Sequence, residues 1–262
     1  MVHMNIENRR QKLVNYLKHE GKTSVNDLAN IFETSGATIR TDLRTLEEEG
    51  LVVRRYGSAE ACGASKIGQA SIEDRSMDEK QTLNLDLKSA IAKKACELIR
   101  DGDSIILDCG STTLQMVPHL EDKLALTLMT NSMHIVNAMA QLEREHTVII
   151  PGGTYRRISA SFHGKLAEQA FSQFTFDKLF IGADGFDLNS GTITYNEAYQ
   201  VSQAMYEAAN EVIVVLDSNK FGRRSPNVVV PLKDIDAVIT DSNISPEHLA
   251  ELESNNIKVY LV

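Results

Sequence analysis

Residues 104–114 read Ser-Ile-Ile-Leu-Asp-Cys-Gly-Ser-Thr-Thr-Leu. A short apolar run leads into a turn of Gly and hydroxyl residues, and a helical stretch follows, which is the order of strand, loop and helix in an α/β domain. From residue 83 onward, strand-like runs alternate with helical stretches in the same way. This alternation predicts a mostly parallel sheet with strands at 104–108, 125–130, 147–150, 178–182, 212–217, 228–231, 236–240 and 257–262.

The first sixty residues follow a different pattern. One amphipathic helix ends at Gly21, and Ser24 caps a second, with Asp27 in the capping-box position. A third helix over about 37–49 has Ile39, Leu43 and Leu46 on one face. Because a short β run at 51–57 follows, the pattern predicts a winged helix-turn-helix.

Small and charged residues without clean periodicity dominate the stretch 58–82. Such a composition is typical of a linker or hinge. We therefore expect a winged helix-turn-helix domain at 1–60, a linker at 61–82 and an α/β domain at 83–262.

The overall composition excludes several classes of protein. The 262 residues include 42% hydrophobic and 24% charged residues, which are ordinary globular values. The longest apolar runs have the length of a strand and the N-terminus has no apolar signal core, so we expect a cytoplasmic protein without a membrane partner. Cysteine and histidine spacings fit neither a disulfide framework nor a metal site, and no cofactor is expected.

The net charge of −9 argues against a non-specific binder of nucleic acid. The charge is unevenly divided, because residues 1–60 hold nine basic and nine acidic residues and the remainder carries the whole excess of acid. The composition therefore leaves a specific DNA-binding domain possible within the first sixty residues.

The outward face of the third predicted helix carries Arg40, Thr41, Arg44 and Thr45. Arginine on such a face can pair with guanine O6 and N7 in the major groove. Ser35 and Thr38 lie where a helix N-terminus can contact phosphate. The alternative is a solvated face on which the two arginines pair with Asp42, Glu47 or Glu48.

These residues go beyond a general pattern. Three segments (24–29, 38–50 and 54–57) resemble the N-terminal domain of the DeoR-type bacterial repressors, although Gly57-Ser58 stands where that family usually has Gly-Gly. Operator DNA is the partner that this resemblance implies. The implied DNA contacts are Ser35, Thr38, Arg40, Thr41, Arg44, Arg54 and Tyr56.

Five predicted strands end in loops that suit a small hydroxylated anion. The loop at 110–113 supplies Gly and three hydroxyls at a helix start, without the lysine of a Walker A loop. Lys220 offers a point charge for phosphate in the last of these loops. Any single loop can instead be ordinary turn chemistry, but the carboxyl ends of parallel strands converge on one edge. The five loops lie at 110–113, 130–132, 151–154, 182–185 and 217–221, each directly after a predicted strand.

The region from about 86 to 262 resembles the DeoR-type sensor domain, which is related to ribose-5-phosphate isomerase. Stretches at 114–120, 129–139, 159–171 and 174–180 are similar to family members that control glucitol (sorbitol) and galactitol operons. The resemblance implies a repressor of a sugar-alcohol operon that a phosphorylated polyol or ketose releases from DNA. We expect the phosphate at Gly110, Ser111, Thr112, Thr113 and Lys220, and sugar hydroxyls at Asn131, Gly152, Gly153, Asp184 and Glu197.

An enzyme is the alternative, because Asp184, Glu197 and Lys220 could isomerise a sugar phosphate by acid–base enolisation. The first sixty residues favour the repressor, since a small isomerase has no use for them. Because one recognition helix reads only a few base pairs, we expect a homodimer or homotetramer on paired half-sites.

Overall fold

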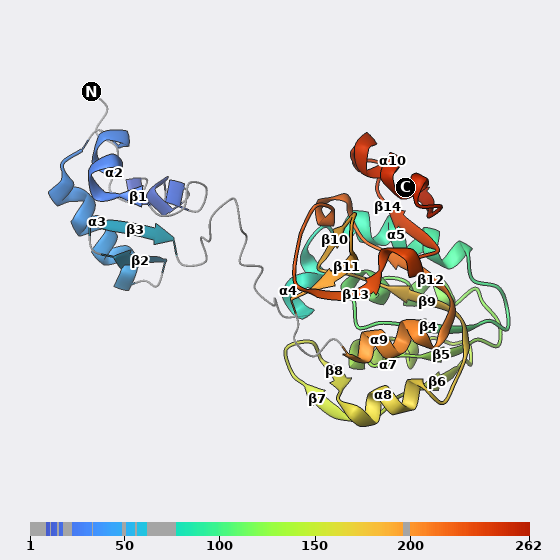
Figure 1. The fold of residues 1–262 in the computed structure, drawn as a ribbon. Helices are drawn as coiled ribbons and strands as arrows, with labels where there is room; N and C mark the ends of the chain where they lie inside the picture. Colours follow the sequence, from blue (N-terminus) through green and yellow to red (C-terminus); the bar gives the residue numbers. More distant parts are fainter. Residues whose placement is uncertain are drawn as a thin grey trace. The chain divides into compact units, whose positions relative to one another are not determined.

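The computed structural model describes residues 9–10, 12–14, 16–17, 23–32, 34–48, 51–55, 57–61, 77–195 and 200–262. The chain divides into two compact units, Met1–Glu73 and Asp74–Val262 (Figure 1). Each unit has a hydrophobic core of its own. In this described part of the chain, no helix is long and apolar enough to cross a bilayer.

The described elements of the first unit are those of the predicted winged helix-turn-helix, while the predicted end of the first helix at Gly21 lies outside the described residues. The Ser24 hydroxyl accepts a hydrogen bond from the Asp27 amide and so caps the second helix, which confirms the predicted cap. The third helix buries Ile39, Leu43 and Leu46, while Arg40, Thr41 and Arg44 are exposed. Its elements are β1 (Thr23–Ser24), α2 (Val25–Ile31), α3 (Gly36–Glu48), β2 (Val52–Arg55) and β3 (Ser58–Ala61).

The wing of this unit is an antiparallel hairpin of β2 and β3. Arg55 pairs with Ser58 at the end of the hairpin, and β1 pairs with the other side of β3. Gly57 has φ +73°, a conformation that glycine adopts without strain. Ser58, which stands where the DeoR-type pattern has a second Gly, is the first residue of β3.

Within the described residues, the second unit has a seven-stranded sheet in the order β15-β14-β12-β9-β4-β5-β6, and every neighbouring pair is parallel. This confirms the predicted α/β class. The chain reverses the direction in which it adds strands between β4 and β9, so these two strands flank the topological switch point. The strands are β4 (Ser104–Leu107), β5 (Thr127–Met129), β6 (Thr147–Ile149), β9 (Phe176–Ile181), β12 (Ala209–Val215), β14 (Ala237–Thr240) and β15 (Lys258–Leu261).

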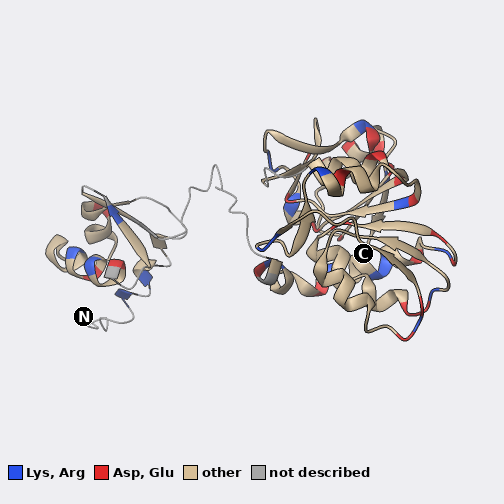
Figure 2. Cartoon of the chain, turned by 90° about the horizontal axis from the view of Figure 1, so that it is seen from below, with Lys and Arg blue, Asp and Glu red and all other residues tan. Residues whose placement is uncertain are grey.

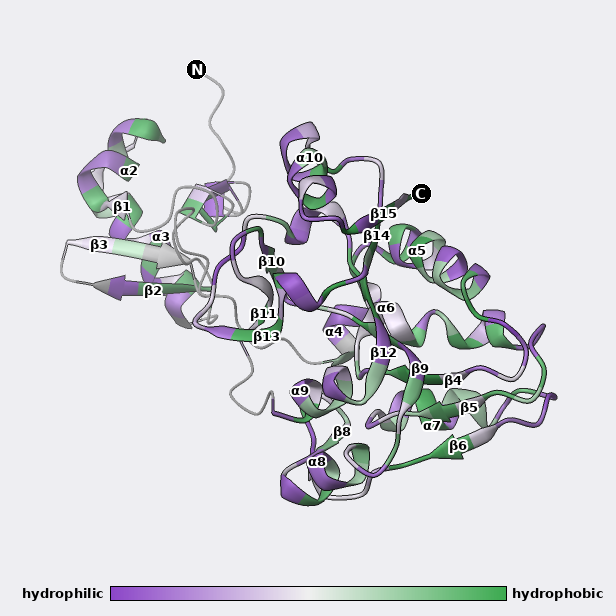
Figure 3. Cartoon of the chain, turned by 45° about the vertical axis from the view of Figure 1, so that its right-hand side comes forward, coloured by the Kyte–Doolittle hydropathy of each residue, from purple (hydrophilic) through white to green (hydrophobic). Residues whose placement is uncertain are grey.

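Helices cover both faces of the sheet, because alternate strand residues point to opposite faces and both sets are apolar. Ile105 and Leu107 pack with α5 (Leu85–Glu97), η1 (Val117–Leu120) and α7 (Met133–Met139). Ile106 packs with α8 (Lys165–Phe171), α9 (Gln200–Glu207) and α10 (Pro246–Ser254). The central strands are accordingly mostly green in Figure 3, and the helices carry stripes of both colours.

The structure adds short elements that the sequence did not predict. Hairpin β7–β8 (Thr154–Arg156 and Ser161–His163) follows β6. Strands β10 (Gly185–Asp187) and β11 (Gly191–Thr194) form a separate antiparallel sheet with β13 (Asn227–Pro231). The sequence predicted β13 as a strand but counted it with the mostly parallel sheet, to which it does not belong.

A further helix, α4 (Met77–Thr82), occupies the end of the range expected as linker. The difference has a physical reason, since Met77 is buried and Lys80 reaches a carboxylate of the second unit.

Candidate functional site

The loops after β4 and β9 meet at the switch point, where Asp108 joins them. Its carboxylate accepts hydrogen bonds from the Gly110 amide (3.0 Å), the Thr113 hydroxyl (2.9 Å) and, across the switch point, the Gly182 amide (3.2 Å). The two loops approach closely here, because a Cβ on Gly182 would lie 3.8 Å from the Gly110 Cα. Asp108 therefore fixes the shape of what we call the carboxyl edge, the loops that follow β4, β5, β6, β9 and β12.

Burial dominates the titration of two side chains at this edge. Burial raises the pKa of Asp108 to about 6, although its hydrogen bonds from Thr113, Gly110 and Gly182 act in the opposite direction. Burial, followed by the charge of Asp108, raises the pKa of the Cys109 thiol to about 11. Cys109 is therefore a neutral thiol at ordinary pH rather than a nucleophile.

The hydroxyl-rich loop divides into two parts. Thr113 is fully buried, and its hydroxyl also contacts the Asp108 and Gly110 carbonyl oxygens, so this group holds the loop together. Within the described residues, no side chain caps the short helix α6 (Ser111–Leu114). The hydroxyls of Ser111 and Thr112 make no hydrogen bond there either, which leaves these two groups able to contact a ligand.

Asn131 and the two glycines after β6 lie at the same edge. Asn131 is 1% exposed and its amide donates to the Phe162 carbonyl oxygen of β8 (3.2 Å). Its Oδ1 is buried without a hydrogen-bond partner in the described part of the chain. Buried acceptors are nearly always satisfied, so this oxygen suits a donor such as a sugar hydroxyl. Gly152 and Gly153 have φ +70° and +107°, values that favour glycine.

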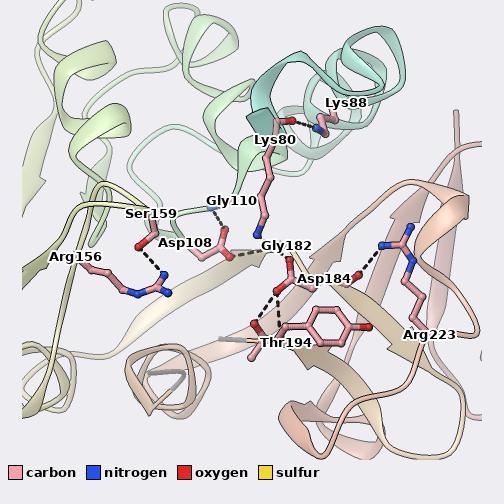
Figure 4. Close-up of polar contacts among 11 residues, drawn as sticks. Lys80, Lys88, Asp108, Gly110, Arg156, Ser159, Gly182, Asp184, Thr194 and Arg223 are labelled. Atoms are coloured by element: carbon pink, nitrogen blue, oxygen red, sulfur yellow. Dashed lines mark hydrogen bonds and ion pairs between the residues drawn. The ribbon is translucent and has the colours of Figure 1, made fainter. Parts of the chain in front are cut away.

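Asp184, after β9, has partners on both oxygens (Figure 4). Its Oδ2 accepts from the Thr194 hydroxyl (2.8 Å) and the Tyr195 amide (3.3 Å), and its Oδ1 lies 2.9 Å from Lys80 Nζ. Burial would raise the pKa of Asp184, but Lys80, Thr194 and Tyr195 together hold it below its usual value. This carboxylate is therefore ionised and acts as an acceptor.

Four basic side chains lie near one another and near Asp184 and Asp217, and we call them the cationic cluster: Lys80, Lys88, Lys220 and Arg223. Arg223 donates to the Asp184 carbonyl oxygen (3.1 Å), and Lys88 Nζ donates to the Lys80 carbonyl oxygen. Burial, followed by the charge of the neighbouring Lys220, lowers the pKa of Lys88 to about 8. Burial, then Arg223, lowers the pKa of Lys220.

This concentration of positive charge suits a phosphate dianion. The pKa values of Lys88 and Lys220 fall because both ammonium groups are desolvated and lie near other cations, Lys220 and Lys80 for Lys88, and Arg223 and Lys80 for Lys220. An entering anion would relieve that repulsion. Within the described chain, the Lys220 ammonium group makes no hydrogen bond or ion pair, while its backbone amide donates to the Asp217 carbonyl oxygen (3.0 Å). Sequence reasoning found Lys220 but missed Lys80 and Lys88, because the first lay in the expected linker and the second is spaced like an ordinary helix lysine.

The second polar surface is the outward face of α3. Ser35 caps this helix through the Thr38 amide (3.1 Å), and the two hydroxyls share a hydrogen bond (2.9 Å). In the alternative interpretation, Arg40 and Arg44 pair with acidic residues of the same region, but neither arginine pairs with Asp42 or Glu47. Asp42 is turned inward to Arg9 and Arg10, and Glu47 pairs with Arg54. Arg40 and Arg44 are exposed with no ion pair to either acid.

The wing and the helix are joined by Arg54. Its guanidinium Nε lies 2.7 Å from Glu47 Oε2, and its amide donates to Glu47 Oε1 (3.2 Å). This contact lowers the pKa of the Glu47 carboxyl. Two predicted site residues, Tyr56 and Glu197, lie outside the described residues, and so does the Glu48 side chain. Both charge signs are present on each unit (Figure 2).

The described residues hold no group of three or more His, Cys, Asp or Glu placed to bind a metal ion. Cys96 and Cys109 are free thiols. The carboxyl edge offers hydrogen-bonding groups and fixed charges, among them Asn131, Asp184 and Lys220. It suits the recognition of a small hydroxylated anion.

Two family models match the chain. The model of the DeoR-like helix-turn-helix domain matches residues 9–64, and that of the DeoR C terminal sensor domain matches residues 83–242. A putative aga operon transcriptional repressor of Escherichia coli O157:H7 is 37% identical, covering 97% of this chain and 93% of the relative. The lactose phosphotransferase system repressor of Lactococcus lactis subsp. lactis is 31% identical, with 95% and 96% covered.

Among solved structures, ribose 5-phosphate isomerase A from Methanocaldococcus jannaschii is similar to part of this chain. The two chains are 22% identical with a TM-score of 0.40, and the match covers 53% of this chain and 55% of the isomerase.

Proposed function

This chain belongs to the DeoR family of DNA-binding transcriptional repressors of sugar-metabolism operons, and we propose that its operon serves the catabolism of a sugar alcohol, sorbitol (glucitol) or galactitol. Its whole-length relatives are named as repressors, and the chain is a regulator rather than an enzyme. Its effector is a phosphorylated polyol or ketose. The stretches at 114–120, 129–139, 159–171 and 174–180 support the sugar-alcohol assignment. Because a repressor acts on the chromosome, we place the protein in the cytoplasm.

The observation that carries the DNA-binding part is the exposed face of α3. Arg40 and Arg44 are outward and unpaired with Asp42 or Glu47, so their guanidinium groups are available for base edges. Ser35, Thr38, Thr41, Arg54 and Tyr56 are proposed as further contacts with the operator. Two-fold pairing of subunits would place two such helices on successive half-sites. Sedimentation equilibrium would distinguish a homodimer from a homotetramer.

The observation that carries the effector part is the cationic cluster beside hydroxyl-rich loops. A phosphate dianion would be held by Lys220 with Gly110, Ser111, Thr112 and Thr113, and Thr113 would contribute mainly by fixing the loop. Sugar hydroxyls would meet Asn131, whose Oδ1 lacks a partner in the described chain, and Asp184. Gly152, Gly153 and Glu197 are proposed to complete this contact.

Release from DNA follows from a population shift, because the effector must bind the DNA-incompetent arrangement more tightly than the competent one. A gel-shift assay on the DNA upstream of the operon tests this, with sorbitol, galactitol and ketose phosphates added in turn. We expect one of these to release the operator, and free sugars to be ineffective. If no sugar phosphate releases the DNA, the effector assignment is wrong while DNA binding stands.

Point variants locate the effector. We expect Lys220→Ala and Thr112→Ala to weaken binding of the active sugar phosphate, measured by isothermal titration calorimetry. Lys165→Ala is the matched control, because Lys165 is a surface lysine of α8. Wild-type affinity in both site variants would contradict the phosphate assignment. Turnover of pentose or hexose phosphates at ordinary enzyme rates would contradict the assignment as a regulator.

A further inference from the structure

Within the second unit, helix α4 is held to the rest of the unit at three points. The Met77 amide donates to the Ile158 carbonyl oxygen (3.0 Å), in the loop between β7 and β8. Lys88 Nζ donates to the Lys80 carbonyl oxygen, and Lys80 Nζ lies 2.9 Å from Asp184 Oδ1 (Figure 4). The helix is also the first described element after residue 61, where the wing ends. It therefore stands between the wing and the carboxyl edge in the sequence.

The partner of Lys80 belongs to the proposed effector site. Asp184 Oδ2 is fixed by Thr194 and Tyr195, so only Oδ1 depends on the ammonium group. Lys80 also contributes to the repulsion that lowers the pKa of Lys88 and of Lys220. An anion that enters beside Lys220 is therefore attracted to Lys80 as well, and it competes with Asp184 Oδ1 for the same ammonium group.

A second observation on α4 supports a ligand near this helix. The side-chain Nε2 of Gln81 is buried and has no hydrogen-bond partner among the described residues. Gln81 directly follows Lys80, and α4 contacts α6, the helix that begins at Ser111. A buried amide donor without a partner is costly unless a bound group accepts from it.

We propose that Lys80 is the residue that couples effector binding to α4. The phosphate of the effector draws the Lys80 ammonium group away from Asp184, and Asp184 Oδ1 then accepts a sugar hydroxyl. Helix α4 thereby loses the ion pair between Lys80 and Asp184. The proposal rests on the proposed function. Lys80 acts as a positioning residue, because its part in DNA release runs through α4. The exchange meets the requirement that a ligand must contact the two arrangements differently.

The test measures the operator dissociation constant with and without saturating sugar phosphate, in wild type and in Lys80→Met. Typical couplings change affinity roughly 5- to 150-fold, and we expect a wild-type ratio within that range. In Lys80→Met we expect the ratio to fall below about twofold, while Lys80→Arg, which keeps the charge, retains most of it. Because the effector is saturating, weaker effector binding alone does not alter the ratio. Lys165→Met is the control and should match wild type.

Reciprocity gives a readout that a merely structural role would not move. Operator DNA must weaken effector binding by the same factor, and in Lys80→Met this effect should vanish as well. Hydrogen exchange of the 77–82 amides in the wild-type protein needs no variant. We expect the effector to change their protection, and no change would overturn the proposal even if Lys80→Met fails to fold.

Two failures are distinguishable. If wild-type protein is released by no sugar phosphate, the proposed function fails and this proposal falls with it. If wild type is released and Lys80→Met is released by the same factor, the effector assignment stands and the role of Lys80 is overturned.

Discussion

Gly153 allows hairpin β7–β8 to close against the loop after β6. A Cβ at this position would lie 2.6 Å from the His163 carbonyl oxygen, and φ is +107°. Gly152 also has positive φ, +70°, but a Cβ there would meet nothing within 4 Å. A side chain at Gly152 would therefore meet only an unfavourable backbone conformation, whereas one at Gly153 would also clash with the backbone.

We predict that Gly153→Ala lowers the free energy of unfolding of the second unit by about 2 kcal/mol or more. Gly152→Ala should cost only the left-handed conformation, about 1 kcal/mol. Thermal melting of the two variants checks the difference. Equal melting temperatures would mean that the loop shifts freely to admit a side chain.

Asp108 makes a prediction about pH. Its pKa of about 6 in the folded chain is above the ordinary value of 3.8, so the folded state takes up this proton first as pH falls. The cost of holding the charge is therefore present above about pH 6 and is relieved between about pH 6 and pH 4. We expect wild type to gain on the order of 1 kcal/mol relative to Asp108→Asn between about pH 7.5 and about pH 5.

Chemical denaturation of both proteins at the two pH values measures that difference. Using the variant as reference removes the opposite contributions of Asp184, Asp187 and Asp241, whose pKa values are lowered. A stability difference that does not change with pH would place the Asp108 pKa near its ordinary value.

The residues that sequence reasoning missed are those that depend on distant partners. Gly110, Asp184 and Lys220 stand in loops whose composition already suits a ligand. Lys80 acquires its role from Asp184, which is 104 positions away, and local pattern carries no such information. The buried amide oxygen of Asn131 likewise becomes distinctive only once β8 is in place.

Among whole elements, α3 was the easiest to predict and the short hairpins were the hardest. The spacing of Ile39, Leu43 and Leu46 defines one apolar face, and a single partner surface suffices to bury it. The parallel strands are continuous apolar runs because both of their faces are covered. Strands β7 and β8 have three residues each, and β7 is largely exposed, so neither has a period long enough to recognise.

The orientation of α3 predicts a specific role for Arg44. We expect Arg44→Ala to weaken operator binding by roughly 5- to 150-fold and to reduce the preference for operator over scrambled DNA, since a lost base contact costs about 1–3 kcal/mol. The side chain is exposed, so the melting temperature should not change. Fluorescence anisotropy on both DNAs gives the two constants. Arg144→Ala, an exposed arginine of the second unit, is the control.

Over the whole molecule, the excess of acidic residues lies outside the segment that carries the proposed DNA-binding surface. Residues 1–60 are balanced in charge, and residues 61–262 carry the net −9. The acidic remainder repels DNA at long range, so binding must come from a few close contacts. Within the first unit, Glu47 and Asp42 engage Arg54, Arg9 and Arg10, which leaves the exposed arginines of α3 as the main positive groups of that helix.

This arrangement predicts a steep salt dependence that one wing residue changes measurably. Each phosphate contact contributes a slope of about −0.9 in log affinity against log salt concentration. To contact a phosphate, Arg54 must give up its ion pair with Glu47, which lies 2.7 Å away. We expect Arg54→Ala to make the slope shallower by about 1 and to weaken binding to all DNA sequences equally. Arg144→Ala should leave the slope unchanged. Titrations of operator DNA between about 50 and about 200 mM salt measure these slopes. An unchanged slope in Arg54→Ala would show that Arg54 of the wing makes no phosphate contact.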